Sequence, residues 1–131
     1  MDFTEILFEI DEGVAVITLN RPEARNALAP VMRQELAHAL KTVREKAGEE
    51  VRALILTGAG GAFCAGGDVK SMGSRLKSAA LAREALRDDH QKMIDLLNIE
   101  VPVISLIDGA AAGAGANIAL AAAFVLATPK G

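Results

Sequence analysis

Apolar residues in the first half of the chain follow a two-residue period and then a period of three to four residues. The runs Phe3 to Ile10 and Val14 to Leu19 are β-rich, and the turn sequence Asp11-Glu12-Gly13 between them predicts a hairpin. A helix is predicted to begin near Pro30, which suits a first helical turn, and to end at Gly48. Its apolar stripe consists of Met32, Leu36, Leu40, Val43 and Ala47.

The middle of the chain begins with a continuous apolar run, Ala53 to Thr57, which is typical of a strand buried on both faces. The run leads into a glycine-rich loop over Gly58 to Gly67, and the polar segment between Val69 and Ala80 is predicted to be a mobile loop. A second amphipathic helix is predicted over Leu81 to Ile99. Its inward residues are expected to be Ala82, Leu86, Met93, Ile94 and Leu97.

The last part of the chain repeats the order of strand, loop and helix. Val103 to Ile107 is predicted to be a strand, and the alanine-glycine tract after it becomes a helix near Ala114 that runs toward Ala122. Phe124 to Thr128 follows as a further strand, so the pattern favours an α/β fold with largely parallel pairing. No linker divides residues 1–131, but the sequence stops after a strand without a closing helix. We therefore expect one domain that is incomplete at its C-terminus.

Composition narrows the class of partner. A hydrophobic content of 51% supports a packed core, and a net charge of −3 without a cationic cluster argues against nucleic-acid or membrane partners. The longest apolar stretch, Ile118 to Thr128, is far shorter than the roughly 20 residues that span a bilayer. Only Cys64, His38 and His90 could join carboxylates at a zinc site, so none is expected. With no targeting segment visible, these features predict a cytoplasmic protein with a small-molecule partner.

Two glycine-rich segments each follow a predicted buried strand, where glycine lets a ligand approach the backbone N–H groups. Neither is a nucleotide motif. Val69 stands before Lys70-Ser71 where a phosphate-binding loop has glycine. Phe63 and Ile118 stand where a dinucleotide fingerprint has its third glycine. The two glycine-rich segments are therefore expected to bind a ligand other than a nucleotide.

Three segments carry a resemblance to a known family. They are NRPEARNAL at residues 20–28, ALILTG at 53–58 leading into AFCAGGDV at 62–69, and DGAAAGAG at 108–115. In order and spacing they resemble successive motifs of the crotonase superfamily, the enoyl-CoA hydratase/isomerase family. The resemblance covers nearly the whole chain and implies a spiral of ββα units, trimers or dimers of trimers, and acyl-CoA substrates.

By this resemblance, the backbone N–H groups of Gly67 and Ala114 form an oxyanion hole for a thioester carbonyl. Two convergent donors of this kind stabilise an enolate oxygen. The resemblance also implies that the coenzyme A channel is lined by parts of the first two motifs, and that coenzyme A enters as the substrate's thioester, with no separate cofactor. The expected contacts are Ala24, Arg25, Ala27, Leu28, Ala65, Gly67, Asp68, Val69 and Lys70.

Simpler interpretations exist for several of these residues. The alanine-glycine tract could serve only to pack a helix tightly against a sheet. Cys64 reads as a small buried hydrophobic residue and Asp68 as a cap of its own loop. His38 and His90 lie among charged residues of helical patterns and read as solvated.

Asn117 is a departure from the family pattern, which in hydratases has a glutamate here and a second glutamate farther along. A carboxamide can orient a group but cannot act as a general base. Family members with an amide here are often isomerases, and the subgroup acting on epoxidised phenylacetyl-CoA has a similar stretch. The second acid would lie beyond Gly131.

Two functions from different classes remain open. One is an acyl-CoA isomerase or hydratase-like enzyme, present here as a fragment, a cleaved chain or a truncated product. The other is a non-catalytic acyl-CoA-binding or assembly subunit that lacks the proton-transfer acids. A remnant without function is a third alternative. The expected state is a homo-trimer or hexamer, or a complex with the missing C-terminal half, because the last helix and strand expose apolar surface.

Overall fold

A computed structural model describes residues 2–67, 80, 83–84, 87, 91 and 94–131 of the chain. The principal sheet has the strand order β1-β2-β3-β5-β7. Its strands are β1 (Ile6–Asp11), β2 (Val14–Leu19), β3 (Ala53–Gly58), β5 (Val103–Ile107) and β7 (Phe124–Ala127). β1 and β2 form the predicted antiparallel hairpin, and the other three pairings are parallel. The predicted α/β fold is confirmed.

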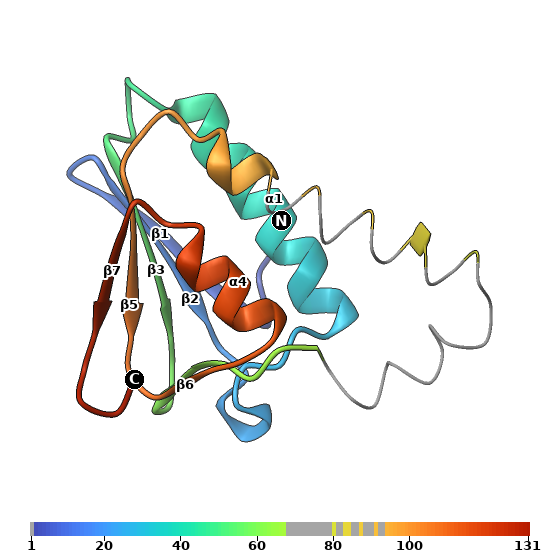
Figure 1. Cartoon of the computed structure of the whole chain (residues 1–131). Helices are drawn as coiled ribbons and strands as arrows, with labels where there is room; N and C mark the ends of the chain where they lie inside the picture. Colours follow the sequence, from blue (N-terminus) through green and yellow to red (C-terminus); the bar gives the residue numbers. More distant parts are fainter. Residues whose placement is uncertain (1, 68–79, 81–82, 85–86, 88–90, 92–93) are drawn as a thin grey trace.

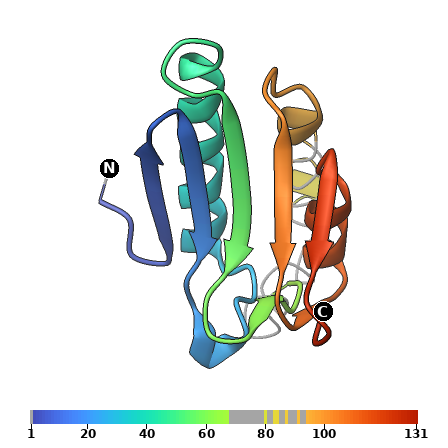
Figure 2. The same cartoon turned by 90° about the vertical axis from the view of Figure 1, so that its left-hand side faces the viewer.

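Both labelled helices, α1 (Pro30–Lys46) and α4 (Ala114–Leu120), lie on the same side of this sheet (Figure 1). In Figure 2 the viewer looks at the face of the sheet that the helices do not cover, and α1 and α4 lie behind the strands. The carboxyl ends of the parallel strands meet at one edge of the sheet. The short 3-10 turn η1 (Pro22–Ala24) lies in the segment that follows β2 there.

α1 follows from the sequence pattern. Pro30 occupies its first turn, where the missing N–H costs no hydrogen bond, and Gly48 at φ +86° ends the segment. Four residues of the predicted stripe are buried to 1% exposure or less: Met32, Leu36, Leu40 and Val43. Each such side chain contributes about 1.5–3 kcal/mol of transfer free energy, so this face holds α1 on the sheet.

The second predicted helix lies partly outside the described residues, as does the loop expected over residues 69–79. Residues 94–97 are helical, but the expected inward face is wrong there. Ile94 and Leu97 are 48% and 65% exposed, whereas Leu96 is buried. The ion pair between Arg44 of α1 and Asp95, at 2.8 Å, accompanies this rotation.

A second, two-stranded sheet was not predicted. β4 (Ala62–Cys64) lies inside the segment that the sequence predicts to be a loop, and it pairs in parallel with β6 (Ala110–Ala111). α4 ends at Leu120 instead of Ala122, and β7 leaves Phe124 and Leu126 more than half exposed. Within the described residues, no helix has both the length and the hydropathy to cross a membrane.

Candidate active site

Three loops from the carboxyl ends of neighbouring strands are joined by backbone hydrogen bonds. The N–H of Ala65 donates to the carbonyl of Arg25 at 3.0 Å, and the N–H of Leu28 donates to Gly66 at 2.7 Å. The N–H of Ala112 donates to Cys64 at 3.0 Å. The segments that carry the three sequence motifs are therefore linked by backbone hydrogen bonds, in the place where parallel sheets usually bind ligands.

The glycine pair Gly66-Gly67 lies directly beside the pair Gly113-Ala114. A β-carbon at Gly66 would lie 3.0 Å from the carbonyl oxygen of Ala112 and 3.8 Å from the amide nitrogen of Ala114. Gly66 and Gly113 have φ values of +98° and +55°, in the region that glycine adopts without steric cost. The close approach of the two backbones thus depends on missing side chains.

Gly115 brings α4 against β4. A β-carbon at this position would lie 2.6 Å from the β-carbon and 2.8 Å from the Sγ of Cys64, and it would also collide with the carbonyl oxygen of Cys64. Cys64 is fully buried, and burial raises the pKa of its thiol, although a backbone hydrogen bond with Gly66 and the charge of Arg33 act in the opposite direction. Cys64 is therefore a packing residue here, as the sequence predicts.

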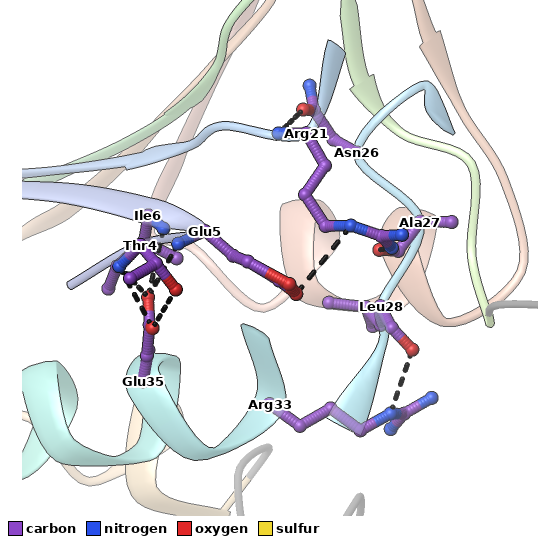
Figure 3. A network of polar contacts seen from close by, with 9 residues as sticks. All are labelled: Thr4, Glu5, Ile6, Arg21, Asn26, Ala27, Leu28, Arg33 and Glu35. Atoms are coloured by element: carbon purple, nitrogen blue, oxygen red, sulfur yellow. Dashed lines mark hydrogen bonds and ion pairs between the residues drawn. The ribbon is translucent and has the colours of Figure 1, made fainter. Parts of the chain in front are cut away.

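Asn26 makes the side-chain hydrogen bonds that hold the first loop, residues 20–28, in place. Its side chain is fully buried and donates from Nδ2 to the carbonyls of Ala59 and Ala62, both at 2.9 Å. Its Oδ1 accepts from the N–H of Arg21 at 2.8 Å, as Figure 3 shows. Both the nitrogen and the oxygen of this amide therefore have hydrogen-bond partners inside the protein. The first loop is consequently fixed to the segment that connects β3 with β4.

Two guanidinium groups hold the carbonyls that follow Asn26 (Figure 3). Arg21 donates from Nη1 to Ala27 at 2.7 Å, and the buried Arg33 donates from Nε to Leu28 at 3.1 Å. Nε of Arg21 also lies 3.6 Å from Oε1 of Glu5, which is a charge contact longer than a hydrogen bond. Charge-assisted bonds of this kind are stronger than neutral ones, so they stiffen the loop.

Glu35 of α1 anchors the start of β1. Its carboxylate is buried and accepts from the N–H groups of Thr4, Glu5 and Ile6, at 2.9 to 3.1 Å, and from the hydroxyl of Thr4 at 3.1 Å. Burial alone would raise the pKa of this carboxyl, but the hydrogen bonds outweigh it and the pKa lies below its ordinary value of 4.5. Glu35 therefore remains ionised near neutral pH.

The residues expected in the site differ in exposure. Arg25, Ala65 and Asn117 are exposed, and Asn117 lies one turn into α4. Leu28 is only 2% exposed and belongs to the hydrophobic core. The half-buried members are Ala24, Gly67 and Ala114, and Ala27 is buried. Asp68, Val69, Lys70 and His90 lie outside the described residues, whereas His38 is exposed beside the ring of Phe3.

This geometry is accompanied by a family match over almost the whole chain. The family model for enoyl-CoA hydratase/isomerase matches residues 9–130. The chain belongs to this family. A probable enoyl-CoA hydratase of Rhodobacter capsulatus is 44% identical over 128 residues, which make up 97% of this chain and 47% of that protein. The 1,2-epoxyphenylacetyl-CoA isomerase of Escherichia coli K12 is 38% identical over 93% of this chain and 47% of its own length.

Solved structures of the enoyl-CoA hydratase/isomerase family share the fold. A putative enoyl-CoA hydratase from Streptomyces coelicolor has a TM-score of 0.91 at 37% identity, over 98% of this chain and 47% of that one. An enoyl-CoA hydratase/isomerase from Xanthobacter autotrophicus has a TM-score of 0.90 at 35% identity, over 98% of this chain and 48% of that one. The expected crotonase-like fold is confirmed, and the chain spans about half the length of the relatives it matches.

Sequence reasoning assigned no individual role to Asn26 or Gly66, and it covered Gly115 only through the alternative that the alanine-glycine tract packs a helix tightly against a sheet. Asn26 stands in the first motif, and its residue type was a usable signal because asparagine tolerates a left-handed backbone better than most residues. Gly66 and Gly115 each adjoin a residue expected to donate an N–H group. A glycine next to such a donor indicates that another backbone must come close.

Proposed function

We propose that the protein containing this chain acts on an acyl-CoA thioester and stabilises its enolate with the backbone N–H groups of Gly67 and Ala114. The observation that carries the proposal is the approach of Gly66 to Ala112 and Ala114. Ala114 is the first residue of α4, and the first N–H groups of a helix have no partner within it. Loss of one donor from such a pair typically costs about 3–4 kcal/mol of activation free energy.

Binding of the coenzyme A portion is assigned to the rim of the same loops. Arg25 is exposed and cationic, which suits contact with a phosphate or the adenine of coenzyme A. Ala24 and Ala65 supply small apolar surface, whereas Ala27 and Leu28 are buried and are assigned to support this rim from beneath. Asp68, Val69 and Lys70 complete the assignment from the family resemblance. Coenzyme A is substrate here, and no separate cofactor is proposed.

The reaction is isomerisation or hydration of an acyl-CoA. Relatives carry both kinds of name, a probable enoyl-CoA hydratase and a 1,2-epoxyphenylacetyl-CoA isomerase. Asn117 favours isomerisation within this pair, because a carboxamide cannot activate water as a general base. We assign the proton-transfer acid to polypeptide beyond Gly131 and the work to a cytoplasmic trimer or hexamer. A role in phenylacetate degradation is the narrower form of the same proposal.

Asn117 also favours a second candidate. A subunit that binds acyl-CoA without chemistry would need the channel and the N–H donors but no acid. The two candidates differ in whether a carboxylate elsewhere in the complete protein completes the site. Mass spectrometry of purified material shows whether more polypeptide accompanies residues 1–131.

Activity measurements on two polypeptides test the proposal. The verified 131-residue chain is expected to bind crotonyl-CoA weakly and to show almost no hydration or isomerisation, since general acid–base help worth about 10²–10⁴-fold is missing. A polypeptide of the relatives' length is expected to turn over an enoyl-CoA. Robust turnover by the 131-residue chain would contradict the assigned roles. Intact binding without turnover by the longer polypeptide would favour the non-catalytic subunit.

A further inference from the structure

We propose that Asn26 is a positioning residue for the N–H donor at Gly67, an inference that rests on the proposed function. The side-chain hydrogen bonds of Asn26 go to Arg21, Ala59 and Ala62 and not to Gly67 itself. It acts through the backbone around it, which is bonded to the residues immediately before Gly67. An apolar side chain could fill this buried position more simply, so the amide of Asn26 calls for a role of its own.

The segment of residues 25–28 holds the loop from Ala59 to Gly66 at four points. Asn26 binds the carbonyls of Ala59 and Ala62 through its side chain. The residues on either side continue the attachment. The carbonyl of Arg25 accepts from Ala65, and the N–H of Leu28 donates to Gly66. The last of these bonds lies one residue from Gly67, and Leu28 also forms a bridge with Gly67.

The backbone is bent to place this amide in the interior. Arg25 and Asn26 have φ values of +51° and +59°, and a non-glycine residue in this left-handed region is uncommon. Two such residues in succession turn the chain so that the Asn26 side chain points inward. The backbone groups of Arg25 and Leu28 then meet the next loop. Strained conformations persist where the surroundings fix them, and here the three side-chain bonds supply that fixation.

Asparagine fits this position for two separate reasons that can be tested apart. It tolerates the left-handed backbone, and it combines two N–H donors with an acceptor. Aspartate has the same shape and keeps the acceptor for Arg21, but it cannot donate to the two carbonyls. Glycine keeps the backbone conformation and removes all three bonds. Asn26→Asp and Asn26→Gly therefore separate hydrogen bonding from backbone conformation.

The first measurement is amide hydrogen exchange of the ligand-free chain at Leu28 and Ala65. Without two of its anchoring bonds, the junction is expected to open more often, and exchange at both amides should rise about tenfold in Asn26→Asp and Asn26→Gly. Val43→Ala is the control. It makes a cavity in the buried face of α1, about 20 Å along the helix from Pro30, and lowers stability without touching the loops.

Exchange that stays within twofold of wild type in Asn26→Asp would overturn the proposal. So would a Val43→Ala variant that raises exchange at Leu28 and Ala65 as much as Asn26→Asp does at equal loss of stability. A larger rise in the Asn26 variants supports it. This arm needs no ligand and does not depend on the proposed function.

The second measurement uses crotonyl-CoA labelled with 13C at its carbonyl. In wild type at saturation the carbonyl resonance is expected to move downfield, and Asn26→Asp should retain less than half of that shift when it is saturated too. A full shift in the variant would overturn the positioning role. A wild-type resonance that does not move at all would overturn the proposed function and the link to Gly67, while the exchange arm alone decides whether Asn26 holds the junction.

Discussion

Gly115→Ala tests how closely α4 must approach β4. The new β-carbon would lie 2.6 Å from the β-carbon of Cys64, where ordinary contact begins at 3.4 Å. The two β-carbons would have to separate by about 0.8 Å. The carbonyl oxygen of Cys64 is also in collision with the new β-carbon, so a smaller shift of α4 does not relieve the clash. Because that carbonyl also accepts from the N–H of Ala112, the movement strains the bond that joins the second and third motifs.

Two opposing terms set the size of the effect. Overpacking a tight contact costs about 1–3 kcal/mol. Alanine is favoured over glycine inside a helix by about 1 kcal/mol, and by less in a first turn. The clash wins, so we expect Gly115→Ala to lower the free energy of unfolding by about 1–2 kcal/mol. For a chain of this size, that corresponds to a fall in melting temperature of roughly 3–8 °C.

Denaturant and thermal unfolding provide the stability, and amide exchange at Ala112 reports the junction. Ala116→Gly is a matched control in the same helix, because it costs about 1 kcal/mol through helix propensity but adds no atom next to β4. Exchange at Ala112 should rise in Gly115→Ala and not in the control. Wild-type stability in Gly115→Ala, or equal exchange in the two variants, would refute the packing argument.

Three further predictions follow from other parts of the molecule. Because the pKa of Glu35 is lowered in the folded state, its contribution to stability should be complete above pH 4.5 and should fall as pH drops through the folded-state pKa. Glu35→Gln should lower the free energy of unfolding by about 2–3 kcal/mol at pH 7, and this free energy should depend less on pH in acid than in wild type. Urea titrations at several pH values measure both effects. Asn117→Glu should add measurable crotonyl-CoA hydration to a polypeptide of the relatives' length that carries a second acid and none to the 131-residue chain, and gain in the short chain would mean that another carboxylate already transfers protons. Because Leu120, Phe124 and Leu126 are 72%, 59% and 58% exposed, the 131-residue chain should sediment as an oligomer, and a clean monomer with a sharp two-state melt would contradict this.

The sequence allowed α1 to be predicted closely because its buried stripe repeats with the period of a single helix. The hairpin and the parallel strands were also predictable, since these strands are alternating or continuous apolar runs of four to six residues. β4 and β6 were not, because strands of three and two residues carry no period. The orientation of residues 94–97 buries Leu96 in the core and is accompanied by a contact between Asp95 and Arg44, which are 51 residues apart in sequence.

The candidate site divides in the same way. The positions of Gly67 and Ala114 came from motif resemblance, and their roles stay predictions. The contribution of Asn26 depends on carbonyls 33 and 36 residues further along the chain. No local pattern contains that information. Similarly, Gly115 looks like an ordinary member of an alanine-glycine tract until the fold places Cys64 beneath it.

The most direct test of the central claim is the response of two backbone amides to a thioester carbonyl. The 1H–15N resonances of Gly67 and Ala114 would be followed while the protein is saturated with crotonyl-CoA and, separately, with coenzyme A, which has no acyl carbonyl. The account predicts that both amide protons move downfield with crotonyl-CoA and not with coenzyme A. Resonances that respond equally to the two ligands, or to neither at saturation, would contradict it.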